Sequence, residues 1–71
     1  MKYKLVKLDN QQSAGQSLIG EIHTISIKDG RFHFGSLVSS PIENIDAKSS
    51  EHRVIIKTKN STYTFEVQVD N

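Results

Sequence analysis

The chain contains no cysteine and no tryptophan, and it has a single proline among 71 residues. Without cysteine it can form neither a disulfide nor a zinc site with thiolate ligands. No apolar run approaches the roughly 20 residues that a membrane-spanning helix needs. The first residues carry lysines but lack the apolar stretch of a secretory signal, so we expect a cytoplasmic protein.

The composition also lacks an excess of charge of either sign. Nine basic and eight acidic residues give a net charge of +1, whereas a typical nucleic-acid-binding domain is strongly basic. The length allows one domain, residues 1–71, which buries only about 60% of the surface of its unfolded chain. Only 35% of the residues are hydrophobic, which is little for building a core. A chain this small can gain stability by assembly, so a homo-oligomer is an open possibility.

What the sequence does contain is a clear hairpin signal in ISIKDGRFHFGS, residues 25–36. Asp29 and Gly30 both tolerate positive φ, as a two-residue type I′ turn requires. The predicted cross-strand pairs are Ile25 with Phe34, Ser26 with His33, Ile27 with Phe32, and Lys28 with Arg31. Since side chains alternate along a strand, both isoleucines and both phenylalanines share one face.

The two phenylalanines of this hairpin have two possible roles. The first role is stacking on nucleic-acid bases. Phe32 and Phe34 alternate with Arg31 and His33, and in OB and cold-shock folds the aromatic side chains of such strands stack on bases. Stacking requires exposed rings, whereas four large apolar side chains on one face favour a core, each worth roughly 1.5–3 kcal/mol when buried. We therefore predict that both phenylalanines are buried.

A second hairpin is predicted near the end of the chain, with its turn at Asn60 and Ser61. The predicted pairs are Thr58 with Tyr63, Ile56 with Phe65, and Val54 with Val67. The predicted inward side chains are those of Val54, Ile56, Tyr63, Phe65, Val67 and Val69. A consistent apolar face on both strands supports this assignment.

The remaining segments are less regular. Residues 3–8 read as a first strand, and the polar residues 9–17 as a loop. Ile22 is expected opposite Leu37, with a bend or bulge beside Gly35. Residues 42–45 suit a short strand or a single helical turn. With no helical period of 10 or more residues, we predict an all-β fold of four to six strands in an antiparallel meander, a curled sheet or a small SH3-like barrel.

Two elements, SSPIENI at residues 39–45 and VIIKTKNSTYTF at residues 54–65, form a recognisable pattern. The pattern, SSPI followed by KTxNSxYxF, resembles one in short β-rich bacterial and phage-borne proteins of unknown function. The resemblance implies a compact β fold and carries over no catalytic residue.

Six residues are candidates for contacting nucleic acid or a protein partner: Lys28, Arg31, His33, Lys57, Lys59 and Tyr63. The histidines show no metal-ligand spacing, and no nucleophile, carboxylate pair or phosphate-binding loop has the expected pattern. We expect no cofactor, no metal and no enzymatic activity.

The predicted function is therefore a small protein-interaction or accessory module. We expect it to bind a protein partner, or a second copy of itself, through a sheet edge or through the polar loop at residues 9–17, because hairpins leave strand edges that can accept another strand. The alternative is a weak nucleic-acid binder that uses a basic outer face around Lys28, Arg31, Lys57 and Lys59.

Overall fold

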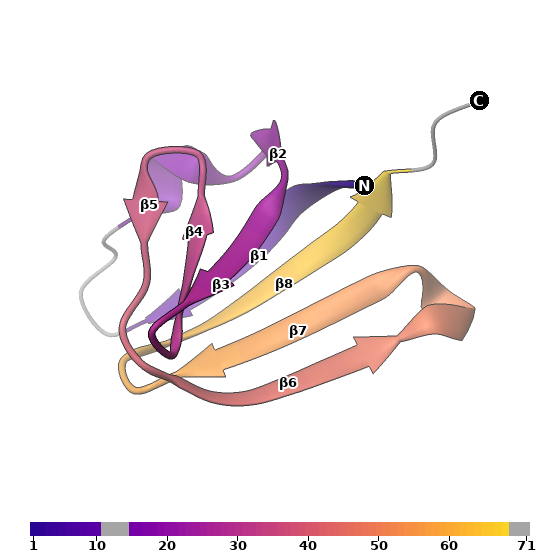
Figure 1. Ribbon diagram of the computed structural model, residues 1–71. Helices are drawn as coiled ribbons and strands as arrows, with labels where there is room; N and C mark the ends of the chain where they lie inside the picture. The colour runs from indigo at the N-terminus through magenta and orange to yellow at the C-terminus, as the bar shows by residue number, and fades with distance from the viewer. Residues whose placement is uncertain (11–14, 69–71) are drawn as a thin grey trace.

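Two antiparallel sheets pack against each other in the computed structural model, which describes residues 1–10 and 15–68 (Figure 1). In these residues the larger sheet has the order β2-β1-β8-β7-β6, and the smaller sheet has the order β3-β4-β5. The strands are β1 (Lys2–Asn10), β2 (Ile22–His23), β3 (Ile25–Lys28), β4 (Arg31–Phe34), β5 (Leu37–Val38), β6 (Ile42–Lys48), β7 (Arg53–Thr58) and β8 (Ser61–Gln68). The all-β fold is confirmed. The two sheets stay open and do not close into a barrel, and the described residues form eight strands where four to six were expected.

The core lies between the two sheets and is built around three phenylalanines. Phe32 and Phe34 of β4 have no exposed surface, as predicted, and Phe65 of β8 is equally buried. The ring centroids are 5.8 Å apart for Phe32 and Phe65 and 5.0 Å apart for Phe34 and Phe65, within the range of favourable aromatic contacts. The other buried apolar residues are Leu5, Leu8, Ile56 and Tyr63. Aromatic packing therefore joins the small sheet to the large one.

The first hairpin has the predicted turn and register. Asp29 and Gly30 have φ values of 54° and 73°, and Ile27 lies opposite Phe32. However, the prediction that Ile27 is buried beside the phenylalanines is wrong, because its side chain is 56% exposed. Ile27 points to the core side, like its partner Phe32. Because β3 is the outer strand of its sheet, however, the larger sheet leaves more than half of the Ile27 side chain uncovered.

The predicted extension of this hairpin is wrong. Gly35, with φ of 58°, is part of a second turn, after which Leu37 pairs with Phe34. Ile22 instead pairs with Lys4 of β1 and joins the larger sheet. A glycine at positive φ lets the chain reverse direction where the sequence had suggested a bend.

The second hairpin forms, but its predicted register is wrong by two residues. Ile56 lies opposite Tyr63 and not Phe65, which places Lys59 and Asn60 in the turn. The hydroxyl of the buried Thr58 accepts a hydrogen bond from the Ser61 N–H at 3.2 Å and selects this turn. Because the error is an even number of residues, the inward and outward faces remain as predicted. Val69, which was expected to face inward, lies outside the described residues.

A bulge in β1 explains how two leucines three residues apart both reach the core. Leu5 pairs with Phe65 and Lys7 pairs with Thr64, so Val6 is an extra residue in the strand. The bulge resets the alternation and turns Leu8 inward along with Leu5. β1 runs beside β8, and the beginning and end of the chain thus form the middle of the larger sheet.

Only three-residue 3-10 turns, η1 (Gln16–Leu18) and η2 (Ser49–Glu51), provide helical structure in the described residues. No helix in this part of the chain has the length and apolar character to cross a membrane. The polar loop predicted at residues 9–17 begins later than expected, because Asp9 and Asn10 are the last residues of β1. η1 begins at its far end, and residues 11–14 fall outside the description. The segment that begins at Ile42 is a seven-residue strand and not a helical turn.

Candidate protein-interaction site

Three of the predicted basic residues lie at one end of the molecule: Lys28, Arg31 and Lys59. Two main-chain hydrogen bonds bring their turns together there. The carbonyl of Gly30 accepts from the Ile42 N–H at 2.8 Å, and the carbonyl of Pro41 accepts from the Lys59 N–H at 3.1 Å. The turn of the first hairpin, the start of β6 and the turn between β7 and β8 therefore meet at this end (Figure 1).

The fourth predicted basic residue, Lys57, lies elsewhere. Its register partners are Asn44 of β6 and Thr62 of β8, which places it on the outer face of the larger sheet. Arg31 is engaged locally, since its guanidinium donates to the carbonyl of Ser39 at 3.0 Å. The predicted basic surface is thus divided between one end of the molecule and one face of the larger sheet.

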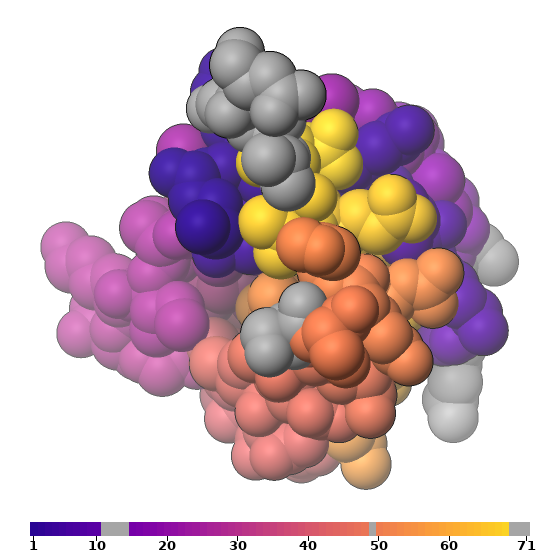
Figure 2. Space-filling view, turned by 90° about the vertical axis from the view of Figure 1, so that its right-hand side faces the viewer, coloured from indigo at the N-terminus to yellow at the C-terminus, as the bar shows by residue number. Residues whose placement is uncertain are grey.

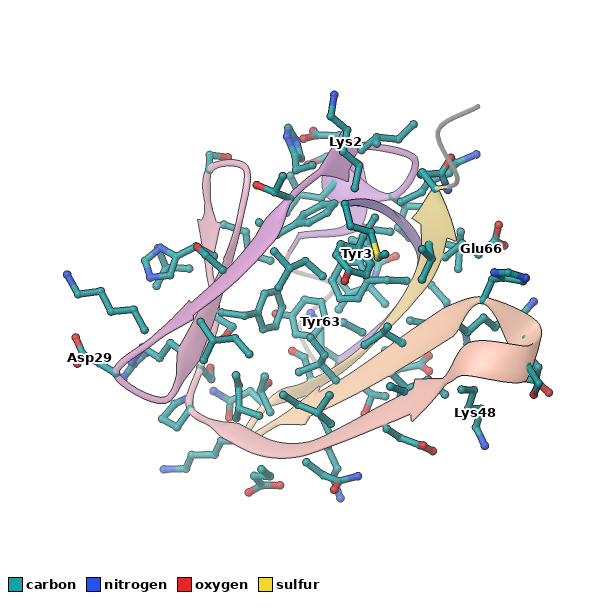
Figure 3. All side chains as sticks on the ribbon, turned by 45° about the vertical axis from the view of Figure 1, so that its right-hand side comes forward. Lys2, Tyr3, Asp29, Lys48, Tyr63 and Glu66 are labelled. Atoms are coloured by element: carbon teal, nitrogen blue, oxygen red, sulfur yellow. The ribbon has the colours of Figure 1, made fainter. Side chains whose placement is uncertain are left out.

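The other two predicted contact residues have different environments. His33 is half-buried on the side of β4 opposite to the phenylalanines, beside Ser26 and Val38. Tyr63 is only 6% exposed, and its ring meets that of Phe32 edge to face at 4.8 Å. Figure 3 shows Tyr63 pointing into the space between the sheets. Tyr63 is therefore a core residue, in agreement with its predicted inward orientation, and little of its side chain is accessible to a partner.

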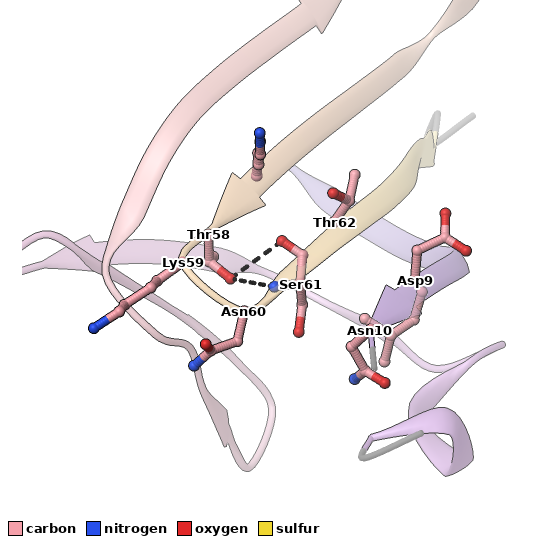
Figure 4. Close-up of a pocket in the computed structure, with 9 residues that line it drawn as sticks. Asp9, Asn10, Thr58, Lys59, Asn60, Ser61 and Thr62 are labelled. Carbon is pink, nitrogen blue, oxygen red and sulfur yellow. Dashed lines mark hydrogen bonds between the residues drawn. The ribbon is translucent and has the colours of Figure 1, made fainter. Parts of the chain in front are cut away.

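A hollow of about 420 Å³ lies beside the turn between β7 and β8 (Figure 4). Its lining residues are Leu8, Asp9, Asn10, Lys57, Thr58, Lys59, Asn60, Ser61 and Thr62. The Thr58 hydroxyl is engaged with the Ser61 main chain, and Figure 4 shows Lys59 extending away from Asp9. The described residues contain no group of three or more acidic, histidine or cysteine side chains that could hold a metal ion.

The most unusual surface lies on the core-facing sides of the two outer strands β3 and β6. Ile27 of β3 lies opposite the fully buried Phe32, yet it is 56% exposed. Ile45 of β6 lies opposite Ile56, which is 2% exposed, yet it is itself 45% exposed. Paired residues in antiparallel strands share a face, so both isoleucines point to the core side and remain uncovered.

These two residues belong to a larger apolar surface, which we call the apolar margin. Its members are the exposed Ile27 and Ile45 and the half-buried Ile25, Ile42 and Val54. The Ile42 N–H at the start of β6 donates to the carbonyl of Gly30 in the turn that follows β3, and the two strands diverge from there (Figures 1 and 3). Seen end-on in Figure 2, the hairpin of β3 and β4 projects as a separate lobe to the left of β6 and β7.

The apolar margin coincides with the two longer strand edges. β6 ends the larger sheet and β3 ends the smaller one, with seven and four residues respectively. The opposite edges, β2 and β5, are two residues long. A longer edge offers more main-chain N–H and C=O groups to an added strand. β6 is therefore the edge best suited to accept another chain.

The exposure of the apolar margin was not predictable from the residue pattern. Ile42 and Ile45 are three residues apart, which does not fit regular alternation. The structure resolves this spacing with a bulge between Ile42 and Asn44, which turns both isoleucines to the core side. The one available signal was the charge on this strand, Glu43, Asp46 and Lys48, because charged residues are typical of sheet edges.

No protein-family model, curated protein sequence or solved structure matches this chain. The fold and the surfaces of the described residues are therefore the basis for inferring a function.

Proposed function

We propose that the protein is a small binding module that accepts an extended polypeptide segment along β6, at the apolar margin. The observation that carries this proposal is the exposure of Ile27 and Ile45 on the core-facing sides of two outer strands. A segment added to β6 extends the larger sheet by one strand, and every second side chain of that segment lies against the apolar margin.

Two physical terms favour such an addition. Main-chain hydrogen bonds to β6 provide affinity that depends little on the sequence of the added segment, and its apolar side chains provide specificity. Complete burial of an isoleucine is worth roughly 1.5–3 kcal/mol, and about half of each of the two exposed isoleucines is available for it. The favoured partner has apolar residues at alternate positions and polar residues between them.

Selection from a displayed library of random peptides, with the wild-type protein as the bait, tests the proposal. We expect the selected peptides to alternate between apolar and polar residues and to lose binding to the variant Ile27→Lys/Ile45→Lys. Val38→Lys is the matched control, since Val38 is 54% exposed but lies beside His33 on the other face of the small sheet. Equal binding by all three proteins would contradict the proposal.

A second candidate function, weak binding of nucleic acid, is supported by the outer face of the larger sheet. The strand register gathers on this face the basic residues Lys2, Lys4, Lys7, Lys48, Arg53 and Lys57 and the acidic residues Asp9, Asp46 and Glu66. Figure 3 shows Lys2, Lys48 and Glu66 pointing away from the core. Two of the acidic residues are paired with lysines on the same strand, at 3.5 and 3.6 Å.

Titration with single-stranded and duplex oligonucleotides over a salt series tests this second candidate. Binding that weakens steeply with salt, and that is lost in Lys4→Glu/Arg53→Glu, supports it. Absence of binding at low salt removes it. The absence of enzymatic activity and the cytoplasmic location remain predictions from the sequence.

A further inference from the structure

We infer that the segment that β6 accepts is β6 of a second copy of the chain, so that the protein is a two-fold symmetric dimer. This inference rests on the proposed function and names the partner. β6 of both copies pairs antiparallel, and the two larger sheets become one continuous sheet. A two-fold interface uses the same strand of both copies and needs a strand that is complementary to itself.

The register of such a pairing is restricted by the faces of the strand. Over the regular part of β6, residues 44–48, core-facing residues must lie opposite core-facing residues in a continuous sheet. The symmetry axis therefore passes beside a residue and not between two residues. Ile45 lies at the centre of β6, which spans Ile42–Lys48. With the axis at Ile45, the exposed side chains of Ile45 from both copies contact each other on the core side.

Two other registers, with the axis nearer the end of β6, are less favourable. With the axis at Asp46, the two Asp46 carboxylates lie directly opposite each other, and like charges in this position are destabilising. With the axis at Ala47, Asp46 of each copy lies opposite Lys48 of the other, but this lysine already lies 3.5 Å from Asp46 of its own strand. That register also leaves Ile45 without an apolar neighbour. With the axis at Ile45, Asp46 lies opposite Asn44, and no like charges are opposed.

The size and composition of the chain agree with a dimer. A domain of 71 residues with 35% hydrophobic residues buries a small core, and assembly is a common way to bury more apolar surface. Pairing of β6 also covers the longest of the four strands that end the two sheets in the described residues. The same edge would otherwise be open to aggregation.

The absence of cysteine allows a direct cross-linking test on the full chain. In the variant Ile45→Cys, the two introduced thiols lie opposite each other across the axis, and we expect a disulfide-linked dimer under mild oxidation. Ala47→Cys is the matched control, because Ala47 is also exposed and core-facing on β6. With the axis at Ile45, the two Ala47 positions are about 13 Å apart, too far for a disulfide.

Light scattering of the wild type and of Ile45→Lys completes the experiment, with thermal melting to verify that each variant is folded. We expect a wild-type dimer and a folded Ile45→Lys monomer. Faster cross-linking of Ala47→Cys than of Ile45→Cys would overturn the register. If the wild type is a monomer that still binds selected peptides, the inference that a second copy is the partner is wrong, and the proposed function stands. A monomer that binds no peptide would contradict both.

Discussion

Phe34 is one of the buried side chains through which the two sheets pack against each other. It is fully buried, and its ring lies 5.0 Å from that of Phe65 and 4.9 Å from that of His23. We expect Phe34→Ala to lower the free energy of unfolding by about 3–5 kcal/mol, because it removes apolar contacts and leaves a cavity. Urea denaturation followed by circular dichroism measures this change.

His33→Ala is the control for this substitution, since His33 is on the same strand and points to the other side of the small sheet. It should change the stability little. A melting temperature that is unaffected by Phe34→Ala would show that the aromatic core does not hold the sheets together.

Gly35 is constrained both by its backbone and by a neighbour. Its φ is 58°, and a Cβ added there would lie 2.6 Å from Nε2 of His23. Gly30, with φ of 73°, has no atom within 4 Å of such a Cβ. We expect Gly30→Ala to cost about 1–2 kcal/mol from backbone strain alone, and Gly35→Ala to cost more.

A double-mutant cycle separates the steric part of the Gly35 effect. His23→Ala in the Gly35→Ala background should recover part of the lost stability, so the double variant is less destabilised than the sum of the single variants. Simple additivity would show that the contact with His23 does not limit residue 35.

The two hairpins show, at the level of elements, what a sequence can and cannot specify. Asp29 and Gly30 predicted the first register correctly, because the type I′ turn needs positive φ at both positions and few residues tolerate it. In the second hairpin, neither Lys59 nor Asn60 has positive φ, and the turn instead depends on the side chain of Thr58. A turn that depends on a buried hydroxyl leaves no comparable pattern in the sequence.

Thr58→Val tests the role of this side chain in the turn between β7 and β8. Thr58 is 2% exposed, and valine keeps its shape while removing the acceptor for the Ser61 N–H. We expect a loss of about 1–3 kcal/mol in the free energy of unfolding. Thr58→Ser, which retains the hydroxyl, should preserve the register, as judged by nuclear Overhauser contacts between Ile56 and Tyr63. An equally stable Thr58→Val variant would contradict this role.

For the molecule as a whole, the sequence predicted the all-β class and most of the core but not the exposed apolar margin. The core residues Phe32 and Phe34 follow from alternation and turn chemistry. The pairing of β1 with β8 joins residues about 60 positions apart, and no local pattern encodes it. The apolar margin depends on which strands end the two sheets, so the exposure of Ile27 and Ile45 follows only from the assembled topology.

We propose that β6 gains a strand partner at its outer edge. Amide hydrogen exchange of the wild-type protein, measured by NMR in a dilute sample and in a concentrated one, tests it most directly. We expect the β6 amides that point away from β7 to exchange more slowly in the concentrated sample, and the amides of the central strand β8 to exchange equally in both. Exchange along β6 that is independent of protein concentration, and that stays unchanged when a selected peptide is added, would contradict it.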